Sequence, residues 1–233
     1  MYKDFKIKPP FFEVGPKAFM YGERMLKLAK AIDKVAMKYD VDVIVTPQYT
    51  DIKLLADNTE RILVFAQHMD YLPVGRGLGS VLPEAVKAAG AVGVMLNHAE
   101  KPLTLEEIEK TIKRADEVGL ATIVCADTVE DLKAIAKLSP NLVVAEPTEL
   151  IGTGTTSDAN YVRATIETVR EINPDIMVLQ GAGISNGQDV YNTIKLGAQA
   201  TGSTSGIIKA ADPEAMVEEM LSALRKAWDE LHS

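Results

Sequence analysis

The chain has 233 residues and a formal net charge of −8, with 47% hydrophobic and 25% charged residues. This balance is typical of a globular protein, and the negative charge argues against nucleic acid or an anionic membrane surface as a partner. The first eight residues lack an apolar stretch of signal-peptide length, and no run is long enough to span a membrane. A lone cysteine, Cys125, excludes an internal disulfide, and we expect a cytoplasmic protein.

Eight short and nearly all-apolar runs alternate with longer amphipathic segments. Runs of this kind are typical of strands that are buried on both faces of a parallel sheet. In chain order, the predicted strands are Phe11 to Val14, Val41 to Val45, Ile62 to Ala66, Val92 to Leu96, Ala121 to Cys125, Leu142 to Ala145, Ile176 to Leu179 and Gln199 to Gly202.

The segments between these strands carry the signals of helices. Apolar residues recur at helical spacing from Gly22 to Tyr39. Thr104 and Thr128 each precede an acidic residue three positions on, which indicates capping boxes. Asp212 is followed by proline and glutamate, a pattern typical of a helix start.

Eight strand–helix units without a long linker predict an α/β fold with one domain over residues 1–233, a (β/α)₈ barrel. An open doubly wound sheet is the alternative, but the number of units and the chain length favour the barrel. Because barrels carry their chemistry at the C-terminal ends of the strands, the residues that directly follow each strand are the candidate site residues.

Three such residues carry groups suited to acid–base chemistry. Lys17 follows the first predicted strand, His98 the fourth and Glu146 the sixth. A single histidine or glutamate at a strand end is more often structural. An ammonium, an imidazole and a carboxylate that meet at one mouth of a barrel indicate catalysis instead.

Two turns rich in small residues, 181–185 and 203–206, follow the seventh and eighth predicted strands. Small residues let backbone amides approach an anion, and barrels often bind phosphate at these two loops, although such residues also make ordinary tight turns. The segment from Gly75 to Gly79 has G-x-G-x-G spacing and not the dinucleotide fingerprint. His68 has no partner at metal-ligand spacing, so we expect no metal site.

Over nearly its whole length the chain resembles the triosephosphate isomerase family, in particular its short archaeal-type branch. The most specific match is Glu146-Pro147 followed by Leu-Ile-Gly-Thr-Gly at 150–154, which joins the family's catalytic base to its closing lid. Further matches are Phe-Ala-Gln-His-Met-Asp at 65–70, Leu-Pro-Glu-Ala at 82–85, Gly-Ala-Val-Gly at 90–93, Asn-His-Ala-Glu at 97–100 and Gly-Ala-Gly-Ile-Ser at 181–185.

The resemblance implies a TIM barrel and an aldose–ketose isomerase, an intramolecular oxidoreductase of glycolysis and gluconeogenesis. Such an enzyme interconverts glyceraldehyde 3-phosphate and dihydroxyacetone phosphate through an enediolate, which needs no cofactor. Glu146 would be the general base, His98 the neutral electrophile and Lys17 the stabilising cation; the family is itself a standard example of this division of labour. The resemblance also implies a homo-oligomer, a dimer or a tetramer.

The resemblance further implies where phosphate binds and what excludes water. Residues 147–156 would form the lid over the reacting atoms. The residues at the family's phosphate-binding positions are Ile151, Gly152, Gly183, Thr204 and Ser205.

Two positions depart from the family pattern. The family carries Asn-x-Lys after its first strand, whereas residues 15–17 read Gly-Pro-Lys, so Gly15 replaces the asparagine and leaves room in the pocket. Lys8 is the other candidate for the lysine. Leu78 replaces a threonine on the loop that enters the neighbouring subunit in the family. Two alternatives therefore stay open: an isomerase of another small sugar phosphate, such as a tetrulose phosphate, and a non-catalytic barrel that binds a phosphate ligand.

Overall fold

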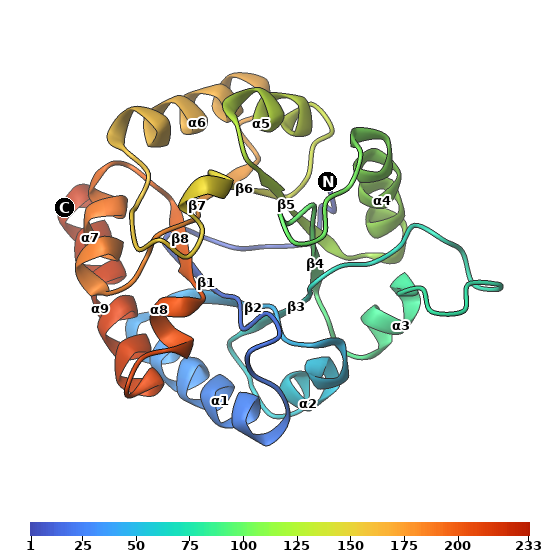
Figure 1. Cartoon of the computed structure of the whole chain (residues 1–233), viewed down its shortest axis with the longest axis horizontal. Coiled ribbons are helices and arrows are strands. Elements are labelled where there is room, and N and C mark those ends of the chain that lie inside the picture. The colour runs from blue at the N-terminus through green and yellow to red at the C-terminus, as the bar shows by residue number, and fades with distance from the viewer.

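The computed structural model, which describes residues 1–233, is a barrel of parallel strands (Figure 1). Each strand pairs with the next, and β1 also pairs with β8, so the sheet has no free edge. This closure confirms the predicted (β/α)₈ barrel over the open doubly wound sheet. The strands are β1 (Phe11–Val14), β2 (Asp42–Val45), β3 (Leu63–Ala66), β4 (Gly93–Leu96), β5 (Ala121–Ala126), β6 (Leu142–Ala145), β7 (Met177–Gln180) and β8 (Ala200–Ser203).

The last two strands end one residue later than the apolar pattern predicts. Gln180 pairs with Ala145 of β6, and Ser203 pairs with Val14 of β1. Backbone pairing, and not side-chain hydrophobicity, sets the length of a strand, so the ladder continues into polar residues at the C-terminal ends of these two strands.

Helices surround the barrel as an outer ring (Figure 1). The capping boxes at Thr104 and Thr128 are present, and the Asp212 side chain accepts hydrogen bonds from two amides of the last helix. The helices are α1 (Gly22–Tyr39), α2 (Ile52–Ala56), α3 (Pro83–Ala88), α4 (Leu105–Val118), α5 (Val129–Ala136), α6 (Ala159–Ile172), α7 (Gly187–Lys195), α8 (Ser205–Ile208) and α9 (Pro213–His232), with 3₁₀ turns η1 (Tyr49–Asp51) and η2 (Thr148–Leu150). No helix has both the length and the apolar character needed to cross a membrane.

Side chains alternate between two apolar cores along each strand. On β1, Phe12 and Val14 belong to the large core between the strands and the helices, whereas Phe11 belongs to a smaller core inside the barrel. Phe65 of β3 also lies inside, and its ring occupies the space beside Gly93, where an added Cβ would come within 2.3 Å of it. The barrel is therefore filled with side chains below its mouth.

The N-terminal segment crosses the end of the barrel opposite to the mouth (Figure 1). Tyr2 exchanges hydrogen bonds with the side chain of Asn141, and the ring of Phe5 packs edge-on against Phe65 with 5.7 Å between the centroids. This segment covers the N-terminal ends of the strands, so the C-terminal ends are left as the open face.

Candidate active site

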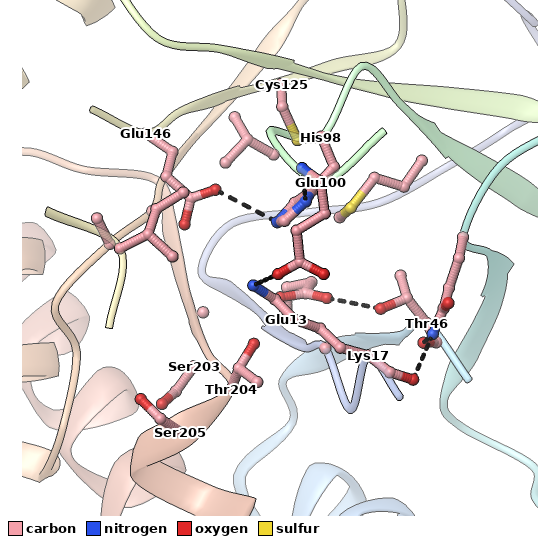
Figure 2. Close-up of a pocket in the computed structure, with 18 of the residues that line it drawn as sticks. Glu13, Lys17, Thr46, His98, Glu100, Cys125, Glu146, Ser203, Thr204 and Ser205 are labelled. Atoms are coloured by element: carbon pink, nitrogen blue, oxygen red, sulfur yellow. Dashed lines mark hydrogen bonds and ion pairs between the residues drawn. The ribbon is translucent and has the colours of Figure 1, made fainter. Parts of the chain in front are cut away.

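A cavity of about 470 Å³ lies at the C-terminal ends of the strands (Figure 2). Its lining comes from segments that follow β1, β2, β3, β4, β6, β7 and β8, together with residues near the ends of the strands. All eight site residues expected from the sequence line this one cavity: Lys17, His98, Glu146, Ile151, Gly152, Gly183, Thr204 and Ser205.

Glu146 directly follows β6 and points toward His98, with 3.9 Å between its carboxylate Oε2 and Nε2 of the imidazole (Figure 2). Burial raises the pKa of the Glu146 carboxyl, and the positive charge of Lys17 and the backbone amide of Ala182 oppose that shift. A carboxylate in such surroundings is a stronger base than one in water, because few water molecules stabilise its charge.

His98 is held in one tautomer by its own loop. Its Nδ1 accepts a hydrogen bond of 3.1 Å from the backbone amide of Glu100, so Nε2 carries the proton and faces Glu146. Burial lowers the pKa of the imidazole, and the nearby charge of Lys17 lowers it further. A neutral imidazole that can donate from Nε2 therefore points into the cavity.

Lys17 brings a positive charge to the same cavity. Its Nζ lies 2.7 Å from Oε1 of Glu100 (Figure 2), and its carbonyl oxygen accepts hydrogen bonds from Gln48 at 2.7 Å and from Gln67 at 2.9 Å. These contacts come from the segments after β2, β3 and β4, and they fix both the backbone and the ammonium of the lysine.

Lys8, the other candidate lysine, lies elsewhere. Its Nζ pairs with Asp40 at 3.1 Å on an exposed surface, and it does not line the cavity. The structure thus brings Lys17, and not Lys8, to His98 and Glu146.

Three non-glycine residues around the mouth have left-handed backbone conformations. Lys17, Asn97 and Ala182 have φ of 49°, 57° and 68°. The Asn97 side chain donates to the carbonyl of Cys125 and accepts from the amide of Leu103, which ties down the turn that carries His98. Such conformations are unfavourable for residues with a Cβ and gather at functional sites.

The expected lid and the expected phosphate loop contact each other. A Cβ at Gly183 (φ 75°) would lie 1.9 Å from the carbonyl oxygen of Thr155, so only glycine permits this approach. Ser203 donates a hydrogen bond of 2.8 Å to the carbonyl of Ile184, which links the turns after β8 and β7. Residues 147–156 and the two loops rich in small residues therefore form one side of the cavity.

The carboxyl group of Glu13 occupies part of the room expected beside Gly15. A Cβ at Gly15 would lie 2.9 Å from Oε1 of Glu13, whose carboxyl group therefore occupies the space next to the glycine. Thr46 donates a hydrogen bond of 3.0 Å to that oxygen, and burial raises the pKa of Glu13 to about 8. Gly15 itself still lines the cavity, so the Glu13 carboxyl group takes up only part of the expected room.

Sequence reasoning did not assign a role to several residues of this cavity: Glu13, Thr46, Gln48, Gln67 and Glu100. Thr46, Gln48, Gln67 and Glu100 follow strands closely, so the rule that located His98 and Glu146 was also a signal for them. Glu13 could have been noticed because it is a charged residue within an otherwise apolar predicted strand.

Comparisons with known proteins place the chain in a family. The family model for triosephosphate isomerase matches residues 16–220. The chain belongs to the triosephosphate isomerase family. The triosephosphate isomerase of Methanobacterium bryantii is 44% identical over 206 residues, which cover 87% of this chain and 91% of that protein. That of Sulfurisphaera tokodaii is 38% identical over 227 residues, 96% of this chain and 99% of that protein.

A solved structure agrees with the fold of the family. The crystal structure of triosephosphate isomerase from Bartonella henselae superimposes with a TM-score of 0.75, covering 96% of this chain and 100% of that one. Its sequence identity is only 14%, so this likeness supports the barrel alone.

Proposed function

We propose that the protein interconverts glyceraldehyde 3-phosphate and dihydroxyacetone phosphate through an enediolate. The observation that carries this proposal is the pairing of a largely buried glutamate and a neutral imidazole, 3.9 Å apart, in the mouth of a triosephosphate isomerase-family barrel. The named relatives at 44% and 38% identity support the same reaction.

The two groups divide the proton transfers between them. Glu146 removes a proton from the carbon next to the carbonyl, and the electrons of that C–H bond form the carbon–carbon double bond of the enediol. The carbonyl oxygen takes the proton of His98 Nε2. The imidazole then takes a proton from the neighbouring hydroxyl, and Glu146 returns its proton to the other carbon, so both residues end as they began.

Lys17 and the phosphate loops bind the rest of the substrate. The ammonium of Lys17 stabilises the negative charge that develops on the enediolate oxygens. We assign the phosphate to the side of the cavity formed by Ile151, Gly152, Gly183, Thr204 and Ser205, where small residues allow close contact with backbone groups. Residues 147–156 serve as a lid that excludes water from the intermediate.

We also propose that the enzyme acts in the cytoplasm, in glycolysis and gluconeogenesis, as a homo-oligomer. The segment between β3 and α3 supports the assembly, because Leu78 is fully exposed and Val74 is 70% exposed in the single chain. A second copy of the chain would cover these side chains. Sedimentation of the purified protein checks this, and a monomer at all concentrations would contradict it.

A coupled assay with glyceraldehyde 3-phosphate tests the proposed reaction. We expect turnover above about 10² per second. Glu146→Gln should abolish it, whereas Glu171→Gln, on an exposed position of α6, should leave it unchanged. A negligible rate in the unaltered protein would contradict the proposal and direct attention to another phosphorylated sugar.

A further inference from the structure

The floor of the cavity contains a carboxyl group to which the proposed reaction assigns no role. Glu13 lies on β1 between Phe12 and Val14, and the alternation along the strand turns its side chain into the barrel, above Phe11. The rest of the floor is largely apolar and includes Met95, Cys125, Val144 and Leu179.

Two glycines make room for this carboxyl group. A Cβ at Gly15 would come within 2.9 Å of Oε1 of Glu13, and a Cβ at Gly202 would come within 2.9 Å of Oε2. Gly202 is paired with Glu13 in the sheet, so the carboxyl group lies between β1 and β8, beside Thr204. Any larger residue at either position would displace it.

The carboxyl group is only half satisfied by the protein. Thr46 donates to Oε1 and is its one hydrogen-bond partner, although Glu13 is 9% exposed and lines the cavity (Figure 2). Oε2 has no hydrogen-bond partner within the protein and reaches the cavity, and an apolar side chain at this position would avoid placing a polar group on an apolar floor. Such a group on the floor of a substrate cavity indicates a ligand that completes its hydrogen bonds.

The surroundings favour the protonated acid. Burial is the main reason that the pKa of Glu13 is about 8, and the negative charge of Glu146 acts in the same direction. The hydrogen bond from Thr46, and to a smaller extent the positive charge of Lys17, lower the pKa and oppose them. Cys125 also faces this region, and burial raises the pKa of its thiol, so it stays uncharged. A bound phosphate would add negative charge and favour the protonated form further.

We propose that Glu13 is a substrate-binding residue, whose protonated carboxyl group donates a hydrogen bond from Oε2 to an uncharged carbonyl or hydroxyl oxygen of the sugar phosphate. This inference rests on the proposed function and deepens it. Gly15, two residues further along the chain, has no side chain and leaves Glu13 as the polar group at this point of the floor. Ionisation of Glu13 removes the donor and places a second carboxylate near Glu146, so binding weakens as the pH rises through the titration of Glu13.

Two variants of similar size separate hydrogen bonding from packing. Glu13→Gln keeps an uncharged donor, whereas Glu13→Leu keeps the volume and removes the polar group. With glyceraldehyde 3-phosphate we expect kcat/KM of Glu13→Gln within about threefold of the unaltered enzyme at pH 7, and a ten- to hundredfold loss for Glu13→Leu. The alkaline decline of kcat/KM near pH 8 should be absent in Glu13→Gln.

These results separate the inference from the proposed function. If the unaltered enzyme turns over and Glu13→Leu matches it, or if Glu13→Gln keeps the same alkaline decline, Glu13 does not bind substrate. If Glu13→Leu does not fold, the pH profile of kcat/KM for Glu13→Gln still shows whether Glu13 binds substrate.

If the unaltered protein shows no turnover, calorimetry with dihydroxyacetone phosphate and with inorganic phosphate tests whether Glu13 binds the sugar part of the ligand. Weaker binding of the sugar phosphate alone to Glu13→Leu would support the inference for another reaction. Equal effects on both ligands, no effect, or no binding of the sugar phosphate to the unaltered protein would overturn it.

Discussion

The ammonium of Lys17 lies 2.7 Å from a carboxylate oxygen of Glu100, although the two residues are 83 positions apart in the chain. The contact joins the segment after β1 to the segment that carries His98, whose Nδ1 accepts from the amide of that same Glu100. Lysine, glutamate and histidine therefore form one connected group, and a change in one member alters the placement of the others.

Replacing Lys17 tests the role of this cation. Lys17→Met should lower kcat/KM by about 10³-fold or more, because it removes the positive charge that faces the developing enediolate. Lys8→Met is the matched control and should leave kcat/KM unchanged, since Lys8 pairs with Asp40 outside the cavity. Steady-state kinetics of both variants check this, and the reverse pattern would show that the cation has been misassigned.

Shortening Glu146 tests its placement. Glu146→Asp withdraws the carboxylate by one methylene and should lower kcat by about 10²-fold, because an error near 1 Å in the position of a base has an effect of that size. The melting temperature should change little, since the side chain lies at the cavity and not in either core. Unchanged kcat would mean that another group removes the proton.

The protonation state of His98 can be observed directly. We expect ¹⁵N NMR to show a neutral ring with its proton on Nε2, and a pKa below the ordinary value of 6.5, because burial and Lys17 disfavour the imidazolium. Lys17→Met should raise this pKa toward the ordinary value. A cationic ring at pH 7 would contradict the proposed role of His98 as a neutral electrophile.

Glu13 should make the stability of the protein depend on pH. The pKa of this carboxyl is about 8 in the folded protein against 4.5 ordinarily, so the folded state binds more protons than the unfolded state between these values. The free energy of unfolding therefore falls as the pH rises through this window.

Denaturant titrations of the unaltered protein and of Glu13→Gln isolate this effect. Between pH 5 and pH 9, the stability of the unaltered protein should fall relative to the variant by roughly 3–5 kcal/mol. Parallel curves for the two proteins would show that Glu13 has an ordinary pKa.

The strands, the helices and the three acid–base residues were predictable because each leaves a local pattern in the sequence. Buried parallel strands are continuous apolar runs, and the residue after each run lies at the mouth of the barrel, which located Lys17, His98 and Glu146. The predicted ends were less accurate at Gln180 and Ser203, because backbone pairing continues where hydrophobicity stops.

The contacts between distant segments were not predictable in the same way. No local pattern shows that Gly202 and Thr46 lie against the carboxyl group of Glu13, because those contacts depend on the pairing of β1 with β8 and with β2. The pairing of Lys17 with Glu100 likewise arises only when the barrel closes. The glycine at position 15 predicted room in the pocket, and in the structure the Glu13 carboxyl group occupies part of that room.

The left-handed backbone at Lys17 sets stability against activity. With φ at 49°, this position favours glycine over any residue with a Cβ, by about 1 kcal/mol. Lys17→Gly should therefore be more stable than Lys17→Ala in thermal unfolding, the reverse of the usual order, although both lack the ammonium. A laboratory selection that scored heat resistance alone would accordingly favour glycine here and would discard the charge to which we assign the stabilisation of the enediolate.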